Sequence, residues 1–249
     1  MKSLQIFIYS ALSTRPTLKI LRYLTANKIN ILMYHGVIED EDDLDCWWML
    51  KRSAFERQIE YIHKHFRVVS LDEALDVIFT KKTKAKNLVV LTFDDGYRNF
   101  LDIVLPVLQS FDMPCIVYVT TGMVQHNSHI WTDQLFHSFH NSKKIEIDFS
   151  DLKLGTWRFD NKIYRRITSH KIIDILKTLP VEEKNDLKKR IIERLRETNS
   201  PEERDTVFDL LTIDDIKRIS QQALVALGCH TMNHEILTKL PFDMAMNEI

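Results

Sequence analysis

Hydrophobic and polar positions along the chain follow two different periods. Short, nearly continuous apolar runs predict strands covered on both faces, whereas apolar residues three and four apart predict amphipathic helices. The predicted strands are 29–37, 67–70, 88–93 and 115–120, and the predicted helices are 53–65, 71–80 and 98–111. Strands that alternate with helices in this way are typical of a parallel α/β sheet or barrel.

This alternation lapses between about residues 125 and 211. Two aromatic-rich segments, 129–136 and 157–159, are followed there by charged helical sequence from Lys171 to Thr198. We interpret the stretch as a helical insertion, because no linker rich in Pro, Gly or Ser marks a domain boundary. Thr212 then predicts the start of a helix that leads to a strand-like run over 224–227, and a last helix opens after Pro241.

The composition excludes several classes of protein. At 249 residues and 45% hydrophobic content, the chain can form one large domain with a core. A formal net charge of −1 provides no general attraction to nucleic acid or to an anionic membrane. No apolar run approaches the ~20 residues that span a bilayer. Residues 1–28 are predicted to form an N-terminal helical segment, packed on the domain or in peripheral contact with a membrane.

The three cysteines, Cys46, Cys115 and Cys229, are odd in number and widely spaced. They match neither a disulfide framework nor a zinc motif. A reducing compartment fits this pattern and favours the cytoplasm, with the cell envelope as the alternative.

Candidate chemistry begins where the apolar run 88–93 meets Asp94 and Asp95. Two adjacent carboxylates repel each other unless a cation or a shared proton compensates, so packing alone does not explain the pair. The carboxyl ends of parallel strands are where sites form in α/β proteins. Gly96 permits a tight turn that brings both carboxylates to this edge.

A second polar cluster, from His230 to His234, follows the run 224–227. Two histidines four residues apart share one face of a helical turn, as a metal ion requires. Together with Asp95 they offer three ligands to a divalent ion and leave a position open for water. The ion lowers the pKa of that water, and the neighbouring Asp94 can accept its proton.

At this point the residues match a known family. Thr92-Phe93-Asp94-Asp95-Gly96, followed by His230-Thr231-x-x-His234, resembles the polysaccharide deacetylases of carbohydrate esterase family 4. Further segments similar to that family are Met33-Tyr34-His35-Gly36-Val37, 55–71, Trp131-Thr132-Asp133 and Leu211-Thr212. The resemblance extends over about residues 29–249. It implies a distorted (β/α) barrel that hydrolyses N-acetyl groups on an amino-sugar polysaccharide or oligosaccharide with the help of a metal ion.

The resemblance also implies roles for individual residues. Asp94 would be the general base, and Asp95, His230 and His234 would bind the metal, for which zinc is the expected ion. His35 is the candidate general acid that protonates the leaving amine, with a hydrogen-bonded core histidine as the alternative. Thr231 would support the ligands.

For three tryptophans and one aspartate near these motifs we expect structural roles. Trp131 and Asp133 are expected to serve packing and capping. Trp47 and Trp48 are expected to be buried, and the alternative is a platform for a sugar ring.

The sequence departs from the family pattern at its C-terminal end. Members usually continue into an aromatic-Pro-aromatic-Gly segment, which lines the acyl pocket and can supply an oxyanion-binding N–H. We therefore expect an incomplete barrel with its C-terminal strands missing and a truncated, weakly active enzyme. The alternatives are a catalytically silent carbohydrate-binding remnant and a metal-dependent amidohydrolase that acts on a non-sugar amide.

Overall fold

The computed structural model describes residues 14–80, 86–196 and 206–249. Its central sheet contains β1 (Ile29–Tyr34), β4 (Arg67–Val68), β5 (Leu88–Phe93), β6 (Cys115–Val119) and β9 (Val225–Cys229). The spatial order is β1-β5-β6-β9, with β4 also beside β5, and all these pairings are parallel. In the described part of the chain, β1 and β9 are the edges of the sheet. The predicted parallel α/β class is confirmed.

β5 lies at the centre because other strands pair with both of its edges. β1 pairs with it along its full length, from Ile29 opposite Leu88 to Tyr34 opposite Phe93. On the other edge, β4 pairs with the first residues of β5 and β6 pairs with the last. All residues of β5 are buried, which explains its unbroken apolar sequence.

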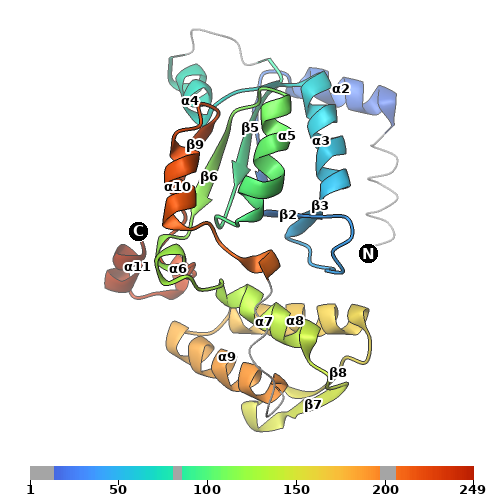
Figure 1. The fold of residues 1–249 in the computed structure, drawn as a ribbon, viewed down its shortest axis with the longest axis vertical. Coiled ribbons are helices and arrows are strands. Elements are labelled where there is room, and N and C mark those ends of the chain that lie inside the picture. The colour runs from blue at the N-terminus through green and yellow to red at the C-terminus, as the bar shows by residue number, and fades with distance from the viewer. Residues whose placement is uncertain (1–13, 81–85, 197–205) are drawn as a thin grey trace.

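Helices lie beside this sheet, and those over 121–126 and 242–248 lie beyond the end toward which β6 points (Figure 1). They are α2 (Arg15–Thr25), α3 (Arg52–His65), α4 (Leu71–Thr80), α5 (Leu105–Ser110), α6 (Thr121–His126), α10 (Ile213–Ser220) and α11 (Phe242–Glu248). α3 buries Phe55, Ile59 and Ile62, the apolar face that the sequence predicts. α10 begins at a capping box formed by Thr212 and Asp215, as expected for a helix start at Thr212.

Two predicted elements are divided in the structure. In place of one helix over 98–111, a π-helical turn (Phe100–Val104) precedes α5, since Pro106 has no N–H to donate. The predicted strand 29–37 breaks at His35. The chain continues as β2 (Gly36–Ile38), which pairs with β3 (Met49–Lys51) in a separate small sheet. A Cβ atom at Gly36 would lie 2.2 Å from Sδ of Met49, so a larger residue would force the Met49 side chain to move.

The 125–211 region lies beyond the end of the sheet toward which β6 points (Figure 1). It contains α7 (Trp131–Asn141), β7 (Glu146–Phe149), β8 (Gly155–Arg158), α8 (Lys162–Leu176) and α9 (Val181–Leu195). The helices agree with the helical interpretation of this stretch, whereas the antiparallel hairpin of β7 and β8 corrects it. The alternation of polar and buried apolar residues over Glu146–Phe149 is a strand pattern that the helical interpretation overlooked. Buried residues of α7, α8 and α9 belong to the same hydrophobic core as those of the sheet.

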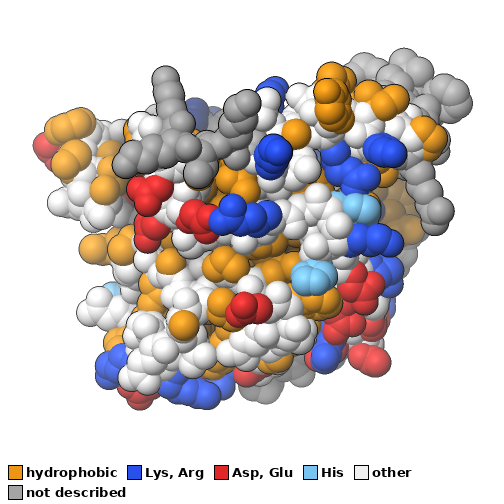
Figure 2. All heavy atoms as spheres, turned by 90° about the horizontal axis from the view of Figure 1, so that it is seen from above, with side chains coloured by type: hydrophobic (Ala, Val, Ile, Leu, Met, Phe, Trp, Pro, Cys, Tyr) orange, Lys and Arg blue, Asp and Glu red, His pale blue; other side chains and the backbone are white. Residues whose placement is uncertain are grey.

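The opposite end of the molecule carries α2 and α4. Figure 2 shows hydrophobic side chains between charged ones on this face, and Tyr23, Leu24 and Phe79 are among the exposed residues of these helices. Of the segment 1–28, residues 1–13 lie outside the described ranges. Within those ranges, no helix has the length and apolar character to cross a membrane.

Candidate functional site

Asp94 and Asp95 occupy a turn directly after β5, which we call the Asp turn (residues 94–98). The backbone N–H of Asp94 donates to the carbonyl of Tyr34 at 2.8 Å, so the parallel pairing with β1 extends one residue past the strand. Asp95 (φ 76°) and Gly96 (φ 80°) both adopt left-handed backbone conformations. This reversal turns the buried Asp95 side chain into the site, as the adjacent glycine suggests.

His230 and His234 lie on the loop that follows β9, which we call the His loop (residues 230–235). The loop is not helical, because Thr231 (φ 62°) and His234 (φ 56°) are left-handed. The expectation that the histidines share a face of a helical turn is therefore wrong. The Thr231 hydroxyl accepts the His234 backbone N–H at 3.1 Å and closes the loop.

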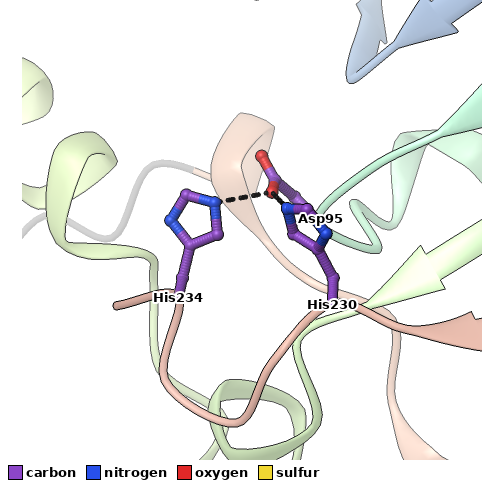
Figure 3. Close-up of side chains that lie close together, drawn as sticks. All are labelled: Asp95, His230 and His234. Carbon is purple, nitrogen blue, oxygen red and sulfur yellow. Dashed lines mark ion pairs between the residues drawn. The ribbon is translucent and has the colours of Figure 1, made fainter. Parts of the chain in front are cut away.

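The two imidazoles converge on one carboxylate oxygen. Nε2 of His234 is 3.1 Å from Oδ1 of Asp95, and Nε2 of His230 is 3.4 Å from the same oxygen. Figure 3 shows both rings directed at this atom. One potential ligand atom from each of the three residues lies within 4.8 Å of the others.

The donor set fits a divalent metal ion. Ligands ~2.0–2.1 Å from a tetrahedral ion are roughly 3.3 Å from one another, which matches the two contacts of Asp95. Among the described residues, no donor makes a hydrogen bond of good geometry to the buried Oδ1 of Asp95. A buried carboxylate oxygen without a donor is costly unless a cation satisfies it. Asp95, His230 and His234 therefore have the chemistry and the spacing to hold a divalent metal ion.

The pKa values of the ionisable groups in the site are shifted in different directions. Burial raises the pKa of Asp94, assisted by the charge of Asp95 and opposed by His230 and His35. Burial would also raise the pKa of Asp95, but the contact with His234 and the charges of His35 and His230 bring it below the usual range. Burial lowers the pKa of His230, which favours the neutral imidazole that a metal requires.

His35 lies at the break between β1 and β2 and is half-buried. It is close enough to influence the pKa of both Asp94 and Asp95. Trp47 lies beside it, with ring centroids 6.2 Å apart. The strand break thus brings His35 to the same edge of the sheet as the Asp turn.

A fully buried carboxylate from α7 fastens the Asp turn to the 125–211 region. Asp133 accepts a hydrogen bond from the Tyr97 hydroxyl at 2.8 Å and another from Nε1 of Trp48 at 3.0 Å. Burial raises the pKa of Asp133 well above its usual range. The start of α7 has no side-chain cap hydrogen bond, so the capping role expected for Asp133 is not seen, and the residue serves instead as a buried hydrogen-bond acceptor.

The two neighbouring tryptophans differ in burial. Trp48 is buried at 9% exposure, as expected, whereas Trp47 is 67% exposed, which corrects the prediction. They lie in the turn before β3. Sequence alone does not separate two identical neighbours, because the direction of each side chain depends on how the turn docks.

The His loop is held by residues that the sequence motifs do not reveal. Lys184 of α9 forms an ion pair with Glu235, and the side chains are only 3% and 14% exposed. The Lys184 ammonium also lies 4.8 Å from the centre of the Trp131 ring. Trp131 is buried, in agreement with the packing role expected for it.

Glu248 of α11 supports the same loop from another side. Its carboxylate accepts hydrogen bonds from the backbone N–H of Asn233 at 2.8 Å and from the Asn233 side chain at 2.7 Å. A cavity of about 380 Å³ lies between the His loop and the 125–211 region. Sequence reasoning misses Lys184, Glu235 and Glu248 because their partners are distant or backbone atoms.

Comparisons with known proteins agree with this architecture. The family model for polysaccharide deacetylases matches residues 81–249, and the chain belongs to that family. The relatives described below are deacetylases, and an N-deacetylase hydrolyses a carbon-nitrogen bond. The resemblance inferred from the motifs is thereby confirmed.

Individual relatives match only part of their length. YxkH of Bacillus subtilis (strain 168), which carries a polysaccharide deacetylase name, is 23% identical over 120 residues, or 48% of this chain and 41% of that protein. The poly-beta-1,6-N-acetyl-D-glucosamine N-deacetylase of Escherichia coli (strain K12) is 31% identical over 86 residues, or 34% of this chain and 13% of the other. The chain therefore spans less than half the length of either relative.

A solved structure shows the same fold. The Streptococcus pyogenes deacetylase PplD, in complex with acetate, aligns with a TM-score of 0.51 at 17% identity, covering 88% of this chain and 63% of PplD.

Proposed function

We propose that this chain is a metal-dependent deacetylase that removes N-acetyl groups from an amino-sugar polymer. Asp95, His230 and His234 would hold the metal, with zinc as the first candidate. The observation that carries this proposal is the convergence of both imidazoles on a buried carboxylate oxygen that has no hydrogen-bond partner. Residues 29–249 would form the catalytic unit, and residues 1–28 a helical segment outside it.

The ionisable residues around the metal ligands fit the two proton transfers of amide hydrolysis. A bound zinc ion supplies a Lewis acid and a water of lowered pKa. Asp94 would accept a proton from the attacking water, and the raised pKa of its buried carboxyl suits a base that works near neutral pH. His35 would protonate the nitrogen that leaves as an amine. The lowered pKa of Asp95 keeps it ionised for metal binding.

The substrate class rests on the relatives. The Escherichia coli relative is named for poly-beta-1,6-N-acetyl-D-glucosamine, so a polymer of N-acetylated glucosamine is the first substrate to test. The ligand set itself does not specify the substrate.

The decisive experiment measures acetate release from a β-1,6-linked N-acetylglucosamine tetramer after chelation and again after zinc is restored. We expect release only with the metal. Retained sugar binding without any release would instead support a silent binding remnant. Turnover of simple acetamides without turnover of the tetramer would support an amidohydrolase of non-sugar amides.

A further inference from the structure

An exposed indole lies beside the candidate general acid. Trp47 is 67% exposed, and its ring lies 6.2 Å from that of His35. Large exposed aromatic side chains that border a site mark contacts with a ligand more often than isolated surface residues do.

The backbone holds Trp47 and His35 side by side. The N–H of Gly36, the residue after His35, donates to the carbonyl of Trp48 at 3.2 Å. A second bond, from the N–H of Met49 to the carbonyl of Cys46 at 3.2 Å, closes the turn that contains Trp47. The position of the indole relative to the imidazole is thus fixed by main-chain hydrogen bonds at the start of the β2–β3 pairing.

Side chains from the 125–211 region fix the same turn. Trp48 is anchored by its hydrogen bond to Asp133 and meets Trp47 at a ring distance of 5.6 Å and an angle of 83°. Lys162 and Arg166 of α8 form ion pairs with Asp43 and Asp45, just before the turn. An indole held in this way loses little conformational freedom when a ligand binds.

The ring contacts leave the indole available. The contact with Trp48 and the contact with His35, at 72°, are both of the edge type rather than stacked. Since Trp47 is 67% exposed, apolar indole surface is open to solvent next to the group that would protonate the leaving amine. The aliphatic C–H face of a pyranose ring complements such a surface, because those hydrogens meet the electron-rich face of the indole.

We propose that Trp47 is a sugar-binding platform, on which a pyranose ring of the substrate polymer stacks beside His35. The inference rests on the proposed function for the choice of ligand, but not on turnover. Trp47 would then set a preference for longer substrates. Oligosaccharides that reach the indole bind more tightly than small acetamides that do not.

The test compares Trp47→Ala, Trp47→Phe and the matched control Trp157→Ala in the full chain loaded with zinc. Trp157 lies on β8 of the 125–211 region, and its indole N–H donates to the carbonyl of Leu154. Binding of the β-1,6-linked N-acetylglucosamine tetramer is measured by calorimetry, which needs no turnover. We expect Kd to rise about tenfold or more in Trp47→Ala, which corresponds to about 1.4 kcal/mol, and to recover largely in Trp47→Phe.

Kinetics supply the second measurement. In Trp47→Ala, KM for the tetramer should rise while kcat and the KM of a small acetamide remain near those of the unmodified chain. Equal tetramer affinity in Trp47→Ala and the unmodified chain would overturn the inference. Absence of acetate release from every variant, with tetramer affinity still dependent on Trp47, would contradict the proposed function while supporting the platform.

Discussion

The sheet and the 125–211 region contribute to the candidate site in different ways. The carboxyl edge of the sheet presents the groups that would do chemistry: the Asp turn follows β5, the His loop follows β9, and His35 follows β1. The 125–211 region supplies Asp133 under the Asp turn and Lys184 beside the His loop. This difference teaches that the chemistry of the site and its positioning are carried by separate parts of the chain.

If the sheet carries the chemistry, changing Asp95 should have the largest effect. Asp95→Asn removes the carboxylate oxygen on which both imidazoles converge, so zinc binding should be lost altogether. Competition with a chromophoric chelator measures the affinity. Retention of zinc at the affinity of the unmodified chain would show that Asp95 is not a ligand.

Asp94→Asn tests the proton-transfer role separately from metal binding. We expect kcat to fall by roughly 10²–10⁴, the contribution typical of a general base, while zinc content stays unchanged. Acetate release and metal analysis on the same sample measure both quantities. Loss of zinc in Asp94→Asn would reverse the roles assigned to the two carboxylates.

Lys184→Met tests whether the 125–211 region positions the metal ligands. Removing the ammonium leaves the carboxylate of Glu235 buried without its partner, next to His234 in the chain. Zinc affinity should fall about 10–100-fold, the effect typical of groups that orient metal ligands.

The control for this variant is Lys188→Met, one turn further along α9. Lys188 donates to Oε1 of Gln134, whereas the direct ion pair with Glu235 of the His loop is made by Lys184. Because this substitution leaves the Lys184–Glu235 pair intact, zinc affinity should remain close to that of the unmodified chain. If both variants lost the same affinity, general damage to α9 would explain the result better than positioning.

The last prediction, Asp133→Ala, concerns the stability of the fold rather than the metal or the turnover. The substitution leaves the Tyr97 hydroxyl and the Trp48 N–H without their acceptor, at about 1–3 kcal/mol for each buried group. Thermal unfolding should show a lower Tm, whereas the exposed Asp174→Ala on α8 should leave it nearly unchanged. An unaltered Tm in Asp133→Ala would mean that other groups replace the lost acceptor.

The sequence predicts the bounds of elements whose hydrophobic pattern is regular. β5 and α4 have the predicted bounds because an unbroken apolar run and an amphipathic face each allow one interpretation. The three potential ligands are also identifiable from their motifs, and the structure brings them together.

What the sequence does not reveal depends on contacts between distant segments. Thr231 and His234 have left-handed backbone conformations although neither is a glycine. The local sequence therefore does not indicate that the His loop is not helical. The Lys184–Glu235 pair joins residues 51 positions apart and appears in sequence as two ordinary surface charges.

The end of β6 lies between the two functional loops and contributes backbone rather than side chains. The carbonyl of Val119 accepts the His230 N–H, while Thr121 and Gly122 donate to the carbonyls of Thr231 and Met232. Thr120 donates to the carbonyl of Asp95 at 3.4 Å. A Cβ atom at Gly122 would lie 2.7 Å from the Met232 carbonyl oxygen.

Main-chain hydrogen bonds therefore help to set the distance between the Asp95 carboxylate and the two imidazoles. Every amino acid except proline can make such bonds. Substitutions at Val119, Thr120 and Thr121 can keep these bonds if the backbone path is unchanged, but Val119 and Thr120 are buried, so replacements there must also fit the packing. Gly122 is the exception, because any side chain there would displace the His loop. The geometry of this site can thus be inherited through large changes of sequence.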